Sequence, residues 1–183
     1  SLLKAARSLE IGVNHLYMKK FDDFSEEEML SYIADGTDDR IYAIAELLRR
    51  GTDLGLIYDA TKIDMLFLEK VKNIVKMERK AKENKGDTDT LYKAKKMGFS
   101  DEFIGKLWDM KGEEIYKIRC EKNIFPVYKM IDTCASEFES YIPYFYSTYE
   151  EENESVVSDK KKIIVLGSGP IRIGQGVEFD YST

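Results

Sequence analysis

The sequence predicts a mainly α-helical domain, followed by the first β-strand and loop of an α/β domain that the chain does not complete. Apolar residues recur at three- and four-residue steps between residues 25 and 122, which is typical of helices with one buried face. Near the C-terminus, the apolar run 163–166 shows no alternation and precedes Gly167 and Gly169. Such a run is typical of a strand covered on both faces in a parallel sheet, and the glycines permit a sharp turn after it.

Capping residues locate the first two helices. Ser25 and Glu28 form a Ser-x-x-Glu capping box, which predicts a helix over residues 26–34. Either Thr37 or Asp38 is expected to cap the next helix, which ends at Gly51. One face of that helix carries the apolar residues Ile41, Ile44, Ala45 and Leu48.

The longest helix is expected to start at Thr61, with Asp64 in a capping position, and to reach about Asn84. One broad stripe predicts its buried face. The stripe consists of Ile63, Phe67, Val71, Ile74, Val75 and Met77.

Three short helices are expected between residues 88 and 122, with glycines at 98 and 112 as breaks. They run from Thr90 to Met97, from Asp101 to Trp108 after the cap Ser100, and from Glu113 to Lys122. This arrangement resembles a DNA-binding helix-turn-helix, although the recognition helix would open with two acidic residues. The other interpretation is a small packed hairpin with Leu107, Trp108, Ile115 and Ile118 at its centre. Trp108 could also anchor a subunit interface, but we favour its burial within one chain.

The pattern changes after Pro126, which ends the helical part. Residues 141–149 are aromatic and β-favouring, so an extended segment is expected there. These rings could stack on nucleic-acid bases. No lysine or arginine is interleaved with them, and an acidic run, 150–154, follows. We therefore favour contact with neighbouring domains. Residues 153–162 are polar enough to be a linker, and a domain boundary is expected at about 158–162.

Composition and charge argue against several kinds of function. A formal net charge of −6 disfavours binding of nucleic acid or anionic membranes over the whole surface. The apolar runs are too short to cross a bilayer, and we expect a cytoplasmic protein. Cys120 and Cys134 are too few for a disulfide framework, and His15 is expected in a loop or at the surface. We expect no catalytic residue in residues 1–158, and no metal or cofactor site in this chain.

The glycine-rich loop at the C-terminus does not match the common nucleotide-binding motifs. In the dinucleotide pattern G-x-G-x-x-G the third glycine would fall at Arg172, and no Gly-Lys-Ser/Thr follows as in a P-loop. An independent nucleotide-binding enzyme would need a longer chain, because a βαβ unit takes about 30 residues. We expect the loop to open a domain that lies mostly outside this chain.

Four separated motifs resemble one family, the large subunits of carbamoyl-phosphate synthetases, in the family's own order. They lie at residues 4–12 (KAARSLEIG), 126–138 (PVYKMIDTCASEF), 146–152 (YSTYEEE) and 167–181 (GSGPIRIGQGVEFDY). The resemblance implies that residues 1–12 close a first synthetase half and residues 13–158 form a helical oligomerisation domain. Residues 159–183 would then begin the second half, which forms carbamoyl phosphate.

The resemblance also implies a function for the longer protein. It would be an ATP-dependent ligase that makes carbamoyl phosphate from bicarbonate, glutamine-derived ammonia and two ATP, with magnesium and potassium, for arginine and pyrimidine synthesis. Its partners would be ATP-grasp synthetase halves of the same chain, a glutaminase small subunit and further copies of itself. Gly176 and Glu178 match positions beside the family's carbamate tunnel; alternatively, the glycines serve only the turn. Ser168 stands where many relatives carry glycine. By itself this chain is expected to be inactive.

Overall fold

The computed structural model describes residues 1–9, 11–132, 134, 137–138 and 144–165. These residues are mainly helical, as the sequence predicts, with one small antiparallel sheet near the C-terminal end. In chain order the elements are α1 (Leu2–Ser8), the 3₁₀ helix η1 (Lys19–Phe21), α2 (Glu26–Ala34), α3 (Arg40–Arg50), α4 (Leu54–Thr61), α5 (Met65–Glu83), α6 (Thr88–Lys96), α7 (Asp101–Trp108), α8 (Gly112–Glu121), β1 (Val127–Met130) and β2 (Phe145–Thr148).

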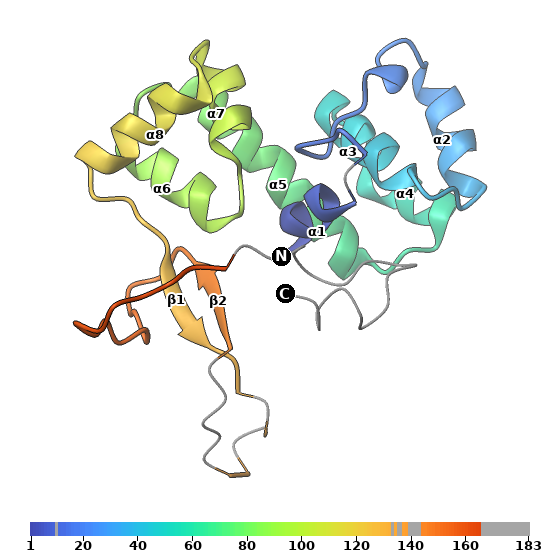
Figure 1. Ribbon diagram of the computed structural model, residues 1–183. Helices are drawn as coiled ribbons and strands as arrows, with labels where there is room; N and C mark the ends of the chain where they lie inside the picture. The colour runs from blue at the N-terminus through green and yellow to red at the C-terminus, as the bar shows by residue number, and fades with distance from the viewer. Residues whose placement is uncertain (10, 133, 135–136, 139–143, 166–183) are drawn as a thin grey trace.

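The long helix α5 lies at the centre of the helical domain (Figure 1). Helices α2, α3 and α4 lie on one side of it, and α6, α7 and α8 lie on the other. Both groups contribute to one buried apolar core, and the last buried apolar side chain of the described chain is that of Ile124. The largest fully buried side chains include Leu3, Phe21, Met29, Ile33, Leu47, Ile57, Leu68, Leu91, Phe99 and Ile104.

Side-chain caps fix where several helices begin and end. Ser25 Oγ accepts a hydrogen bond from the backbone N–H of Glu28 at 3.2 Å, and the Glu28 carboxylate accepts one from the N–H of Ser25 at 2.7 Å. This confirms the capping box and the helix over 26–34. Ser100 caps α7 as predicted, by accepting from the N–H of Phe103. Gly51 ends α3 with φ 93°, in the left-handed region that glycine occupies without strain.

The predicted start of the longest helix is wrong. Thr61 is instead the last residue of α4, a helix that the sequence pattern did not reveal. Lys62 then adopts a left-handed conformation with φ 53°, which interrupts the helical path. Asp64 starts α5 by accepting a hydrogen bond from the N–H of Leu66 at 2.8 Å. A short connection, residues 62–64, therefore separates α4 from α5 where one continuous helix was expected.

Two smaller boundaries also differ from the prediction. The N-cap residue of α3 is Asp39, not Thr37 or Asp38, and it makes no side-chain capping bond. Gly112 is the first residue of α8 and not a break. A Cβ atom at Gly112 would lie 3.1 Å from the backbone nitrogen of Glu102, so the absence of a side chain lets α8 approach α7 closely.

The C-terminal part differs from the expected α/β start. Strands β1 and β2 pair antiparallel, with Val127 opposite Thr148 and Met130 opposite Phe145. The extended segment expected over 141–149 is confirmed at β2, while residues 141–143 lie outside the described part. Ile163 to Val165 form no strand, and Ile163 is 92% exposed. A buried parallel strand needs neighbours on both edges, and no described strand lies beside these residues.

Candidate functional site

A buried ionic cluster joins the N-terminal segment to the helical core. His15 Nε2 lies 3.2 Å from Glu78 Oε2, and Arg49 Nε donates to Glu78 Oε1 at 3.0 Å. Arg49 also donates to the backbone carbonyl of Leu16. The cluster therefore holds the segment around residue 15 against α3 and α5. The sequence-based expectation of a loop or surface histidine is half wrong: His15 lies in a loop, but only 2% of it is exposed.

The protonation states of this cluster favour a structural role. Burial lowers the pKa of His15 below its ordinary value, and the hydrogen bond to Glu78 opposes that shift only in part. Burial of Glu78 disfavours its charge, yet hydrogen bonds from His15 and Arg49 outweigh it and lower the pKa of the carboxyl group. A neutral His15 then donates Nε2–H to a charged Glu78. Its ring also stacks on Phe103, with centroids 3.7 Å apart.

A second cluster joins the helical domain to the chain that follows it. Asp101 accepts hydrogen bonds from Arg119 at 2.6 Å and forms an ion pair with Lys95 at 2.9 Å. Arg119 also donates to the backbone carbonyl of Ile124 at 3.0 Å, just after the last helix. The ring of Tyr149, which follows β2, lies 5.4 Å from Lys95 Nζ and 5.9 Å from Arg119 Cζ. Two buried cations thus attach Tyr149 to the helices.

Trp108 is buried inside this chain and is not available as an interface anchor. Its indole Nε1–H donates to the backbone carbonyl of Ala81 in α5 at 2.7 Å. This satisfies the one polar atom of the ring. Ile115 is also buried, so the packed-hairpin interpretation of residues 88–122 fits the structure. At the start of α8, the Glu114 carboxylate accepts from the backbone N–H of Lys111, where a recognition helix would present contacts to DNA.

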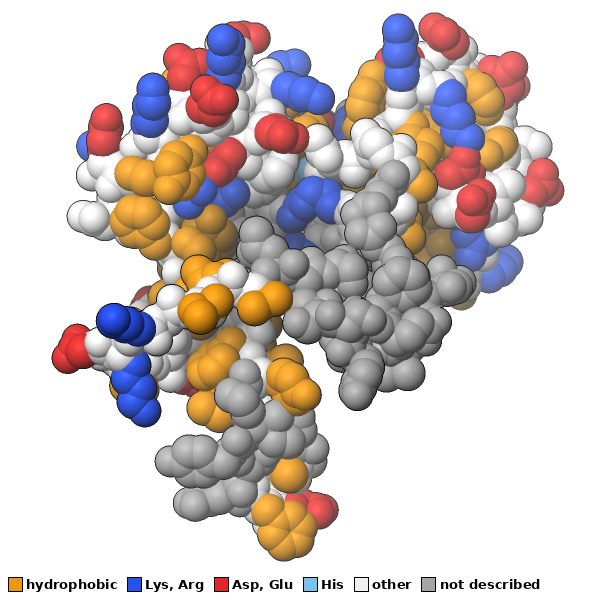
Figure 2. Space-filling view, in the orientation of Figure 1, with side chains coloured by type: hydrophobic (Ala, Val, Ile, Leu, Met, Phe, Trp, Pro, Cys, Tyr) orange, Lys and Arg blue, Asp and Glu red, His pale blue; other side chains and the backbone are white. Residues whose placement is uncertain are grey.

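The β1–β2 hairpin exposes apolar side chains on both of its faces. Tyr128, Met130, Phe145 and Tyr146 are exposed, and Figure 2 shows hydrophobic side chains gathered over this hairpin. The acidic run after β2 covers the outer edge of β1: Glu154 accepts from the N–H of Met130 at 2.6 Å. These carboxylates thus bind backbone and lysine groups of their own chain.

A shallow groove lies between the first turns of α3 and α5, which we call the α3/α5 groove. Its volume is about 330 Å³. The apolar side chains that line it are Ile41, Ile44, Ile63, Phe67, Leu68 and Val71. Phe67 is 63% exposed and Leu66 is 56% exposed. The sequence predicted Phe67 on the buried face of this helix; that is wrong, because Leu68 takes the buried position at this turn and Phe67 lies outside it.

No group of three or more His, Cys, Asp or Glu side chains converges within the described part of the chain. None of the described helices is both long enough and apolar enough to cross a membrane. Gly176 and Glu178, the two residues expected beside a tunnel, lie outside the described residues. Cys120 carries a free, half-buried thiol.

Comparison with protein families identifies both parts of the chain. Residues 1–123 match the model of the carbamoyl-phosphate synthetase large chain, oligomerisation domain. Residues 159–183 match the model of the carbamoyl phosphate synthase preATP-grasp domain. The first match includes α1 through α8 and so covers the whole helical domain. With two consecutive domains of one protein matched in order, the chain belongs to the family of carbamoyl-phosphate synthetase large chains.

Proposed function

We propose that the helical domain joins copies of a carbamoyl-phosphate synthetase large chain to one another. The observation that carries this proposal is the match of residues 1–123 to the family's oligomerisation domain. The α3/α5 groove and its exposed lining residue Phe67 lie within the same residues and support it. Contiguous exposed apolar patches are rare on monomeric proteins and often mark sites of protein contact.

The chain after Ile124 is proposed to connect this domain to a second synthetase half. Its last residues match the preATP-grasp domain, with which that half would begin. The β1–β2 hairpin has apolar side chains on both faces, and a two-stranded hairpin is only marginally stable in water by itself. Contact with neighbouring domains of a longer chain would bury these faces.

For the longer protein we propose the ligase reaction that forms carbamoyl phosphate from bicarbonate, glutamine-derived ammonia and two ATP. ATP, magnesium and potassium would be bound by its synthetase halves, and ammonia would come from a glutaminase subunit. Within this chain, Gly176 and Glu178 are proposed to line the carbamate path: glycine leaves space, and a carboxylate can accept hydrogen bonds from the amide of carbamate. The helical domain would contribute assembly and not chemistry.

Sedimentation velocity over a concentration series of this chain tests the proposal. We expect reversible formation of dimers or larger species, together with no ATP turnover when bicarbonate and ammonia are supplied. A monomer at every concentration would contradict the assembly role. A parallel titration with duplex DNA addresses the helix-turn-helix alternative, since binding that weakens steeply with salt would favour a nucleic-acid module.

A further inference from the structure

The position of Phe67 identifies a specific face for self-association. We propose that two copies of this chain associate through the α3/α5 groove, with Phe67 of each copy seated in the groove of the other around a two-fold axis. This inference rests on the proposed assembly function and adds the surface, its anchor residue and its symmetry.

Phe67 does not belong to the buried core of its own chain. Leu68 and Val71 are the α5 residues near it that turn inward and are buried. Phe67 is the most exposed aromatic side chain on the described helices, and Leu66 beside it is also exposed. Leaving two large apolar side chains adjacent in water is unfavourable, because burial of apolar surface is favoured in proportion to its area. Their exposure is explained if another surface covers them.

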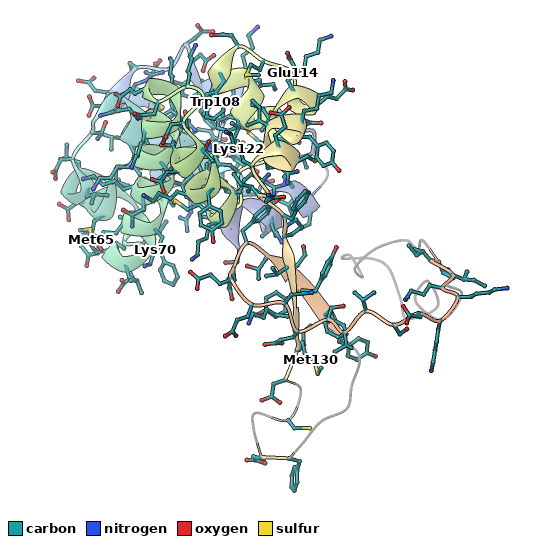
Figure 3. The ribbon with its side chains drawn as sticks, turned by 90° about the vertical axis from the view of Figure 1, so that its left-hand side faces the viewer. Met65, Lys70, Trp108, Glu114, Lys122 and Met130 are labelled. Carbon is teal, nitrogen blue, oxygen red and sulfur yellow. The ribbon has the colours of Figure 1, made fainter. Side chains whose placement is uncertain are left out.

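This face contains both an exposed aromatic side chain and an apolar groove. Phe67 is exposed, and it lines the groove together with apolar side chains from α3 and α5. A surface with a projecting side chain next to a matching groove can pair with itself, because a two-fold axis places each projection over the other copy's groove. Figure 3 shows Met65 and Lys70, which bracket Phe67, at the end of α5 remote from Met130 of the hairpin. Contacts made here would leave the hairpin accessible.

The charges of the chain and of the groove also affect whether two copies can associate. The chain carries a net charge of −6, so two copies repel one another when averaged over their whole surfaces. Asp38 and Arg40, which both line the groove, carry opposite charges. Two identical faces can therefore approach with Asp38 of one copy facing Arg40 of the other.

Phe67 would act as the anchor of a larger contact. A standard interface buries about 800 Å² on each partner, of which one aromatic side chain supplies only part. Binding energy is nevertheless concentrated in a few central residues, and aromatic side chains that fill a pocket are frequent among them. Replacing such an anchor by a charged residue should therefore weaken association strongly while the rest of the surface is unchanged.

The test compares Phe67→Asp with the matched control Phe138→Asp by sedimentation velocity. Phe138 is 74% exposed in the loop after β1, so its replacement makes the same chemical change at a remote, exposed site. For Phe67→Asp we expect the dissociation constant to rise at least about 30-fold, as for loss of an anchor residue. Leu66→Asp should act in the same direction. Phe138→Asp should stay within about threefold of the unmodified chain.

The outcomes separate this inference from the function on which it rests. If the unmodified chain never associates, the assembly function fails and the inference fails with it. If it associates and Phe67→Asp associates equally well, only the α3/α5 face is wrong. Equal weakening by Phe67→Asp and Phe138→Asp would indicate a general effect of charge and would also overturn the inference. Intrinsic fluorescence of Trp108 verifies folding of each variant, and Phe67→Ser replaces Phe67→Asp should the latter unfold.

Hydrogen exchange identifies what covers the groove. Coverage by a second copy predicts that amides in the first turns of α3 and α5 become more protected as protein concentration rises. Protection that is independent of concentration would mean that another segment of the same chain, such as residues 159–183, occupies the groove. That result would overturn the proposed occupant.

Discussion

The helical domain and the chain that follows it are held together by different means. Every buried apolar side chain of the described residues lies at or before Ile124. Beyond Ile124, the hairpin relies on its ladder of backbone hydrogen bonds, on polar contacts at one edge and on the contact of Tyr149 with the helices. The first region therefore has its own hydrophobic driving force for folding, whereas the order of the second depends on its contacts with neighbouring parts.

The ion pairs of the two regions show the same contrast. In the helical domain, Lys95 and Arg119 are buried and share one carboxylate, Asp101. After β2, Glu152 pairs with Lys129 while its own side chain stays in water. Exposed pairs contribute about 0–1 kcal/mol, whereas removing one partner of a buried pair costs several kcal/mol. Substitutions of buried residues before residue 124 should therefore have large effects, and substitutions after it small ones.

The largest effect is expected from Trp108→Ala. The change creates a cavity where α7 meets α5 and removes the donor to the carbonyl of Ala81. Loss of a buried tryptophan side chain costs about 3–5 kcal/mol. Urea denaturation followed by circular dichroism measures the free energy of unfolding. Tyr116→Ala, at an exposed position of α8, is the control and should cost less than about 1 kcal/mol. Equal losses would contradict the packed-hairpin interpretation.

The next largest effect is expected at the joint between the regions. Asp101→Ala leaves Lys95 and Arg119 as buried cations without their carboxylate. We expect a loss of about 3 kcal/mol, the lower end of the range for a broken buried pair, because the Asp101 side chain keeps 20% exposure. Hydrogen exchange near Tyr149 should also rise, since both cations that face its ring lose their fixed position. Unchanged exchange there would show that Tyr149 is held by other contacts.

Local patterns in the sequence were sufficient for most of the helical domain. Ser25 with Glu28 and Ser100 are caps whose partners lie three residues away, so short-range chemistry determines where those helices begin. The failure at Thr61 has a physical reason. Ile57, Ala60 and Ile63 continue at helical steps across the boundary, and the left-handed conformation of Lys62, which no lysine side chain signals, ends α4 before Asp64 caps α5.

Contacts between distant residues could not be predicted in this way. His15 and Glu78 are far apart in sequence, and neither lies in a motif that would indicate the other. The exposure of Phe67 depends on which side chains of other elements pack against the start of α5, which periodicity does not specify. The family, by contrast, was recognisable from the sequence because its motifs are continuous segments. The tunnel positions Gly176 and Glu178 stay predictions.

A smaller, pH-dependent effect is expected at His15. Because burial lowers the pKa of folded His15 below 6.5, the unfolded chain takes up a proton first as the pH falls. Stability is then lost below about pH 6.5, by at most about 1.4 kcal/mol between pH 7.5 and 5.5 for one proton. The groups that face His15 are Glu78, Arg49, Arg7 and the ring of Phe103. Glu78 has a lowered pKa, so its own loss of stability comes at more acidic pH.

The variant His15→Gln isolates this contribution. Glutamine keeps an N–H donor for Glu78 but cannot titrate, so its unfolding free energy should fall less steeply between pH 7.5 and 5.5. Urea denaturation at several pH values gives the two slopes. Parallel slopes would mean that His15 titrates alike in the folded and unfolded chains, and that its burial has no effect on its protonation.

The smallest effect is expected from Phe145→Ser in β2. Phe145 and its cross-strand partner Met130 are both exposed, so the substitution removes one cross-strand pair worth about 0.2–1 kcal/mol and creates no cavity. The midpoint of helical unfolding should not move, because the core ends at Ile124. Hydrogen exchange of the β1–β2 amides should rise, while that of α5 stays unchanged. A shift of the helical unfolding midpoint comparable to that of Trp108→Ala would show that hairpin and helices unfold as one cooperative unit, and the contrast between the two regions would then be wrong.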